Sequence, residues 1–178
     1  KRVEGVLTDL EQNQQFEVER IRKNTLSNPM ASKHEAYYNS IAELTKKVNV
    51  YQNKFDKANT KVKAYQKNLN YISNQRASLT KEVYELVATM NSLEREIGGS
   101  PSKEEIGEKD NVSLFSNLYS SRGGWYPNSY GPTELHMKSF KVATELFQRL
   151  QPKIDTYLEK VNAVGKKMEV AGAPILLD

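Results

Sequence analysis

The stretch that decides the fold spans residues 37–97 and reads YYNSIAELTKKVNVYQNKFDKANTKVKAYQKNLNYISNQRASLTKEVYELVATMNSLEREI. A 4–3 repeat of apolar residues keeps one seam of a helix facing a partner helix, with a slight left-handed supercoil. A strand would need a period of two, so this stretch is predicted to be helical. The seam contains one polar member, Arg76, and consists of Tyr37, Ile41, Leu44, Val48, Tyr51, Phe55, Ala58, Val62, Tyr65, Leu69, Ile72, Arg76, Leu79, Val83, Leu86, Met90, Leu93 and Ile97.

This seam is compatible with one rod or with two helices that fold back on each other. As a single helix, residues 37–97 would be about 90 Å long at ~1.5 Å per residue, and much of the seam would have no partner. The alternative is a turn within residues 73–78, where turn-tolerant residues surround Arg76, and Ser78 or Thr80 would cap the next helix. We favour the fold-back, although the unbroken phase of the seam argues for the rod.

Glycine and proline clusters divide the rest of the chain. Residues 98–111 are predicted to form a loop, and the last helix is expected to begin with Thr133 as its cap and to end at Gly172. That helix has its own seam, and because the seam keeps its phase across Pro152, we expect a kink there rather than a break. The predicted helices span residues 8–26, with a capping box at Thr8–Glu11, and then 30–73, 78–97, 111–120 and 133–171; the seam of the last contains Phe140, Ala143, Phe147, Leu150, Ile154, Tyr157, Val161, Val164 and Met168.

The predicted fold class is therefore all-α: an elongated antiparallel helical bundle with coiled-coil-like heptad packing, in which residues 1–178 form one domain. The chain of 178 residues is 38% hydrophobic and 27% charged, which suits a folded domain. Cysteine is absent, which excludes disulfides and cysteine zinc sites. No apolar run approaches the roughly 18 residues of a membrane span, so none is expected. Because the chain begins at Lys1 and not at methionine, we interpret it as a segment of a longer protein.

No pattern in the chain indicates catalysis. The two histidines, His34 and His136, lie far apart and are predicted to be ordinary residues at helix starts. Dinucleotide-binding, P-loop and nucleophile-elbow motifs are absent, and the carboxylates alternate with lysines on helix surfaces. We therefore expect no catalytic residue, no cofactor and no metal ligand, and we predict that this segment is not an enzyme.

Lysines make the first candidate binding surface. Lys54, Lys57 and Lys61 are the candidates for contact with an anionic polymer, while Tyr51 and Tyr65 occupy seam positions and are expected to be buried. The alternative is a solvated face, or one that pairs with an acidic neighbour. A net charge of +4 is modest for this length, so we do not expect nucleic acid as a partner. Residues 46–81 contain Asp56 as the one aspartate in a basic stretch of Lys46, Lys47, Lys54, Lys57, Lys61, Lys63, Lys67, Arg76 and Lys81.

An aromatic loop makes the second candidate. Trp125, Tyr126 and Tyr130 lie among glycines and prolines in residues 122–132. Aromatic faces pair well with sugar rings and with partner proteins, so these three side chains are candidates for glycan or protein binding. The alternative is that the loop folds over the end of the bundle and covers seam residues there.

The two ends of the chain resemble a known family. Residues 2–11, RVEGVLTDLE, are similar to the junction in bacterial sortilin-like proteins with BNR repeats, which are described as glycosyl hydrolases. Residues 130–133, YGPT, and residues 171–174, AGAP, are similar to the start and the end of a long helix in the C-terminal helical region of that family. The resemblance implies an upstream β-propeller and β domain as partners, and an exported protein in the periplasm or outside the cell. The Asp-box motif of the repeat is absent here, so the resemblance carries over no catalytic residue.

These observations lead to three hypotheses. The first is a non-catalytic helical accessory or protein-interaction module of a larger propeller-containing protein. The second is a binding module for an anionic polymer or a glycan, through the lysines or the Trp125 loop. The third is a homodimeric coiled coil that uses the seam from Tyr37 to Ile97, which predicts a dimer in solution.

Overall fold

A computed structural model describes residues 31–72, 76–108, 112–123 and 131–174 of the chain. Every regular element among these residues is helical, so the predicted all-α class is confirmed. The predicted helix at residues 8–26 lies outside the described residues. The elements are α1 (Ala31–Asn68), a short 3₁₀ helix η1 (Leu69–Tyr71), α2 (Arg76–Gly98), α3 (Pro101–Glu105), α4 (Leu114–Ser121) and α5 (Glu134–Val170).

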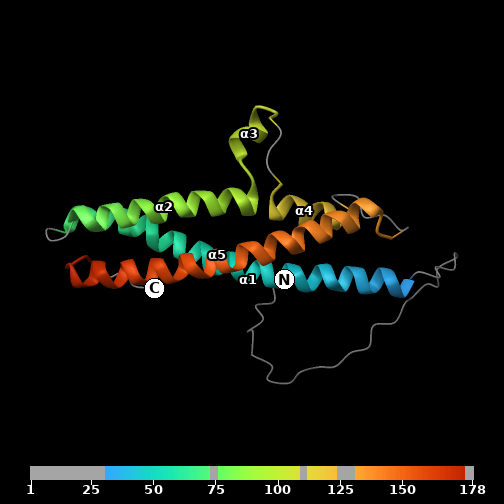
Figure 1. Ribbon diagram of the computed structural model, residues 1–178, viewed down its shortest axis with the longest axis horizontal. Coiled ribbons are helices and arrows are strands. Elements are labelled where there is room, and N and C mark those ends of the chain that lie inside the picture. The colour runs from blue at the N-terminus through green and yellow to red at the C-terminus, as the bar shows by residue number, and fades with distance from the viewer. Residues whose placement is uncertain (1–30, 73–75, 109–111, 124–130, 175–178) are drawn as a thin grey trace, which may run out of the picture. The chain divides into compact units, whose positions relative to one another are not determined.

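The long seam is divided between two helices that pack against each other. α1 ends at Asn68, η1 follows it, and α2 begins at Arg76 and returns along α1 (Figure 1). Arg76 is exposed, and its Nη2 donates a hydrogen bond of 3.2 Å to Oδ1 of Asn70 on the other side of the turn. The fold-back therefore occurs near the expected place, and the one polar seam residue lies at the turn instead of inside the bundle. The expected caps are wrong, because α2 begins at Arg76, so Ser78 and Thr80 lie inside the helix.

Contacts between side chains fix the directions of the helices. Contacting residues on α1 and α5 increase in residue number in the same direction, so these two helices are parallel (Figure 1). Partners on α2 and α5 run in opposite order, so α2 is antiparallel to both. The α1–α5 pairs are Tyr37 with Phe140, Tyr51 with Asp155, and Asn59 with Tyr157; the α2–α5 pairs are Glu96 with Lys153 and Glu82 with Lys167.

The bundle has three columns of helix. α1 and α5 each form one column, and the third consists of two successive helices, α2 and α4. α2 lies beside the C-terminal half of α1, where Asn59 Nδ2 donates to Oε1 of Glu94 at 3.2 Å. α4 lies beside the N-terminal half, where Tyr37 Oη donates to the carbonyl of Ser121 at 2.9 Å. Just after α4, Arg122 Nη2 donates to Thr45 Oγ1 at 2.6 Å. In the described chain, α1 and α5 are thus each one long helix, and α2 followed by α4 completes the bundle.

The connection between α2 and α4 contains a helix that the sequence did not predict. Residues 98–111 were expected to be a loop, but Pro101–Glu105 form α3, a helix of five residues. Proline is favoured at the first position of a helix, because its fixed φ suits the turn and its missing N–H has no partner to lose there. α3 packs against no other element of the described chain and projects from the bundle in Figure 1.

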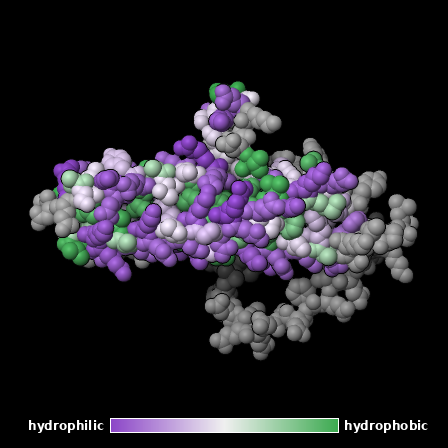
Figure 2. All heavy atoms as spheres, in the orientation of Figure 1, coloured by the Kyte–Doolittle hydropathy of each residue, from purple (hydrophilic) through white to green (hydrophobic). Residues whose placement is uncertain are grey.

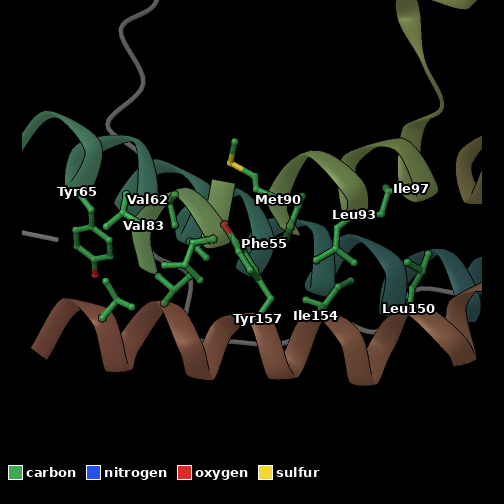
Figure 3. Packing of buried hydrophobic residues seen from close by; sticks show 14 of the residues in the cluster. Phe55, Val62, Tyr65, Val83, Met90, Leu93, Ile97, Leu150, Ile154 and Tyr157 are labelled. Carbon is green, nitrogen blue, oxygen red and sulfur yellow. The ribbon is translucent and has the colours of Figure 1, made fainter. Parts of the chain in front are cut away.

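The seam residues form the core. Side chains from all three columns meet between the helices, and Phe55, Leu93, Leu150 and Tyr157 point into this space in Figure 3. The described seam of residues 37–97 is buried except at Tyr37 and Tyr51, which are half-buried, and at the exposed Arg76. On α5 the seam is buried except at the half-buried Phe140. The predicted seams are confirmed, and because they are covered within one chain, a homodimer would have to use another surface.

The ends of α5 are capped as the sequence indicates. The N–H of His136 donates to Thr133 Oγ1 at 3.3 Å, and the N–H of Thr133 donates to His136 Nδ1 at 3.2 Å, so His136 takes the position that glutamate has in a capping box. At the other end Gly172 has a φ of +85°, and the N–H of Ala173 donates to the carbonyl of Met168 at 2.9 Å. As predicted, α5 continues through Pro152 without a break, and Figure 1 shows the helix bent along its length.

Candidate functional site

The predicted lysines do not all lie in the same environment. Lys54 and Lys57 are exposed on α1, and the Nζ of Lys54 lies 5.1 Å from the ring centroid of Tyr51. Lys61 is half-buried and faces α5, where it lines a small cavity together with Glu169. The structure therefore brings Lys54 and Lys57 to one outward surface and places Lys61 at its edge. We call this surface the α1 lysine face and define it by its exposed members: Lys46, Lys47, Lys54, Lys57, Lys63 and Lys67.

The ion pairs of the described chain lie elsewhere. Lys153 Nζ lies 2.7 Å from Oε2 of Glu96, and Lys167 Nζ lies 2.7 Å from Oε2 of Glu82. Both pairs join α5 to α2. Within the described residues no member of the α1 lysine face forms an ion pair.

Trp125, Tyr126 and Tyr130 all lie outside the described residues. Both interpretations of the loop, as a binding platform or as a cover for the end of the bundle, therefore stay predictions.

A second exposed surface was missed by the sequence reasoning. Val112, just before α4, and Phe115 and Tyr119 on α4 are 62%, 39% and 43% exposed. The spacing of Phe115 and Tyr119 puts these two side chains on one side of the helix, while Leu114 and Leu118 are buried on the other side, and Val112 lies just before the helix. We call these three residues the α4 apolar patch, and Figure 2 shows hydrophobic surface at this place, below the α3 projection. The sequence does contain an indication of this surface. Residues 112–119 carry apolar side chains on two sides, and packing against the bundle can bury only one of those sides.

A chain of hydrogen-bonded polar side chains crosses the bundle, from the buried Tyr157 and Asn59 to the exposed Glu94. Tyr157 Oη donates to Asn59 Oδ1 at 2.9 Å, and Asn59 Nδ2 donates to Glu94 Oε1 at 3.2 Å. Burial, and then the negative charge of Glu94, raises the pKa of Tyr157 above its usual value of 10. A phenol whose pKa is raised keeps its proton near neutral pH, so this arrangement does not favour acid–base chemistry. These two hydrogen bonds link α5, α1 and α2 and so fix the positions of the three helices along one another.

The cavity beside Lys61 depends on a glycine. The cavity is about 120 Å³ in volume and is also lined by Tyr65 and Gly165. Gly165 is buried in α5, and a Cβ atom built on it would lie 2.4 Å from the hydroxyl oxygen of Tyr65 and 3.2 Å from its Cζ. Such a contact forces the buried Tyr65 ring to move. Gly165 therefore gives this hydroxyl the room that it needs between α1 and α5.

We expect Gly165→Ala to lower the free energy of unfolding by about 1 kcal/mol, although alanine favours helices by ~1 kcal/mol, because the displaced ring disturbs the core. Urea unfolding followed by circular dichroism measures the change. The double variant Gly165→Ala with Tyr65→Phe removes the closest atom and should recover most of the loss. The matched control is Gly98→Ala at the end of α2, where a Cβ meets nothing within 4 Å. A destabilisation of Gly165→Ala that Tyr65→Phe does not relieve would contradict this account.

Neither metal-binding nor membrane-spanning features occur in the described part of the chain. No group of three or more histidine, cysteine, aspartate or glutamate side chains there has an arrangement that could hold a metal ion. None of the described helices is both long enough and apolar enough to cross a membrane. No family model matches this chain, and neither a curated protein nor a solved structure matches it.

Proposed function

We propose that this chain is a non-catalytic helical interaction module whose α4 apolar patch contacts a neighbouring domain of a larger protein. The observation that carries the proposal is the exposure of Phe115 and Tyr119 on one side of a helix of eight residues, with the exposed Val112 just before it. Clustered exposed apolar side chains are typical of surfaces that another protein covers. Aromatic side chains in particular are enriched at the centres of protein interfaces.

The anchoring of α4 supports this proposal. Leu114, Leu118 and Ser121 are buried against the bundle, and the N–H of Ser116 donates to Oγ of Ser113 at 3.2 Å, which caps the helix. The patch is therefore presented on a fixed helix and not on a free loop. A surface that is ordered before binding loses less conformational entropy when a partner arrives.

The resemblance of the chain ends suggests which neighbour this is. In the sortilin-like family with BNR repeats, the neighbours would be a β-propeller and a small β domain of the same polypeptide. We propose these as the partners, with the protein exported to the periplasm or beyond. Any glycoside hydrolysis would then belong to the propeller. If the purified chain hydrolysed a glycoside, and a single substitution in residues 31–174 abolished the activity, the non-catalytic assignment would be wrong.

A photo-crosslinking amino acid in place of Phe115 tests the contact. The full protein is expressed in its own cells, irradiated and digested, and the crosslinked peptides are identified by mass spectrometry. We expect the residue at position 115 to crosslink to a neighbouring domain of the same polypeptide, because the patch would face that domain at short range.

The control places the same amino acid at Tyr84, an aromatic residue of α2 that is 60% exposed. This position should give no crosslink to that domain. Equal crosslinking from positions 115 and 84 would mean that α4 has no special contact. A crosslink from position 115 to a second copy of the chain would indicate self-association in place of the proposed packing.

A further inference from the structure

Few contacts hold α3 in place. It has five residues and packs against no other element of the described chain. At its ends the N–H of Lys103 donates to the carbonyl of Ser100 at 3.0 Å, and the N–H of Glu108 donates to the carbonyl of Lys103 at 2.9 Å. A helix this short is unstable without tertiary packing, because its few hydrogen bonds do not offset the entropy lost in starting it. The segment is therefore expected to open locally while the bundle stays folded.

The end of α3 is open to solvent. Glu105, Ile106 and Glu108 are exposed, and Ile106 is 69% exposed although it is apolar. Gly99 and Gly107, on either side of α3, have φ values of +92° and +69°, which glycine adopts without strain. Figure 1 shows this segment projecting away from the bundle. An enzyme can therefore reach its backbone without displacing another helix.

The turn between α1 and α2 differs in this respect. Leu69 and Ile72 there are 7% and 2% exposed and belong to the hydrophobic core, so this part of the chain cannot open without exposing apolar surface. Exposed loop tips with polar residues are the preferred sites of proteolytic cutting. Of these two connections, the one that contains α3 is therefore the one that a protease can engage.

The helices on both sides of this connection are anchored independently of it. Leu93 and Ile97 are buried in the last turns of α2, and Leu114 and Leu118 are buried in α4. Both helices pack against α5. A cut within α3 would remove none of these contacts, so it would not release either helix from the bundle.

We propose that residues 101–108 are an endoprotease cleavage site, and that the cut chain stays together as one bundle. The protease hydrolyses a peptide bond of this segment, such as the bond after Glu105. Water is consumed, the C–N bond breaks, and Glu105 gains a terminal carboxylate while Ile106 gains a terminal ammonium group. One piece then contains α1 and α2, the other contains α4 and α5, and the core joins them. The α4 apolar patch plays no part in this proposal, so the failure of either proposal would leave the other unaffected.

The test digests the full folded chain with a small amount of glutamyl endopeptidase, which cuts after glutamate, and identifies the pieces by intact-mass spectrometry. Within residues 31–174 we expect the first cut in the segment 101–108, which contains Glu104, Glu105 and Glu108. The other glutamates of this range lie in the long helices α1, α2 and α5: Glu35, Glu43, Glu82, Glu85, Glu94, Glu96, Glu134, Glu145, Glu159 and Glu169.

Size-exclusion chromatography shows whether the pieces stay together. We expect one peak that contains both pieces in native buffer and two peaks in concentrated urea, because unfolding removes the core that joins them. Within residues 31–174, a first cut inside one of the long helices would overturn the proposal. Separation of the two pieces in native buffer would overturn it as well.

A core substitution distinguishes local opening from global unfolding. Leu150→Ala removes a side chain that is 0% exposed and so raises the unfolded fraction. Cleavage in the segment 101–108 should keep its rate within about twofold, because this segment opens while the core stays packed. Cleavage after Glu145, which is exposed but lies inside α5, should become about tenfold faster or more, because that bond is reached only when the helix unfolds. Equal acceleration at the two sites would contradict the proposal.

Discussion

Replacing Leu150 with alanine is expected to lower the free energy of unfolding by about 3 kcal/mol. Leu150 is 0% exposed and lies in the middle of the α5 seam, where it points towards the other columns in Figure 3. The substitution removes buried methyl groups and leaves a cavity that rigid neighbouring helices fill only in part. Urea unfolding followed by circular dichroism gives the free energy, and the midpoint should fall with little change in slope.

The control for this prediction lies on the same helix. Leu135 is 66% exposed near the start of α5, and Leu135→Ala makes the same chemical change without opening a cavity. We expect it to change the free energy of unfolding by less than about 0.5 kcal/mol. A difference between the two variants of less than about 1 kcal/mol would mean that the α5 seam is not packed as described.

The second large effect is expected from Tyr157→Phe, which should cost about 2 kcal/mol of stability. The substitution keeps the ring but removes the hydroxyl that donates to Asn59 at 2.9 Å. Asn59 is 6% exposed, so its Oδ1 would be left buried without a donor. An unpaired buried acceptor costs more than the lost bond itself, because its hydration is not recovered.

Two further variants test whether the unpaired group causes the loss. Tyr84→Phe makes the same substitution at an exposed site and should leave stability unchanged. Adding Asn59→Leu to Tyr157→Phe removes the unpaired acceptor as well, so part of the lost stability should return, and the double-mutant cycle should show strong coupling. Additive effects of the two substitutions would contradict a direct bond between these side chains.

The burial of Tyr157 also predicts that the free energy of unfolding depends on pH in the alkaline range. The folded state holds the pKa of Tyr157 above 10, so the unfolded chain releases this proton first. The contribution of Tyr157 to stability is therefore complete below about pH 10 and is lost as the pH rises towards the folded pKa. Tyr157→Phe should weaken this alkaline loss. It should not abolish it, because burial, and then Tyr38, also raises the pKa of Tyr37.

Much of the fold could be predicted from the positions of apolar residues alone. The 4–3 spacing identifies the buried positions from Ile41 to Ile97 and from Ala143 to Met168, because a side chain at such a position always returns to the same side of a helix. The fold-back followed from one polar residue, Arg76, among turn-tolerant neighbours. Thr133 and Gly172 marked the ends of α5 because their local hydrogen bonds need little help from the rest of the chain.

Other features depend on which helix lies beside which, and spacing does not contain that information. Asn59 flanks the seam and reads as an ordinary surface residue, but it is buried because α2 covers that side of α1. The exposure of Phe115 likewise follows from the place of α4 in the bundle. Among the candidate site residues, Lys54 and Lys57 were recognisable by charge, whereas the inward position of Lys61 follows from the approach of α5.

The division of the third column into α2 and α4 affects how the molecule can tolerate change. Among the described residues of the connection at 99–113, none belongs to the hydrophobic core cluster, and the entropic cost of a longer connection grows only slowly with its length. Additional sequence can therefore be accommodated there without a shift in the register of α1 against α5. Among the described residues, the point where α3 emerges is thus the natural site for grafting a tag, a fluorescent reporter or a second domain onto this scaffold.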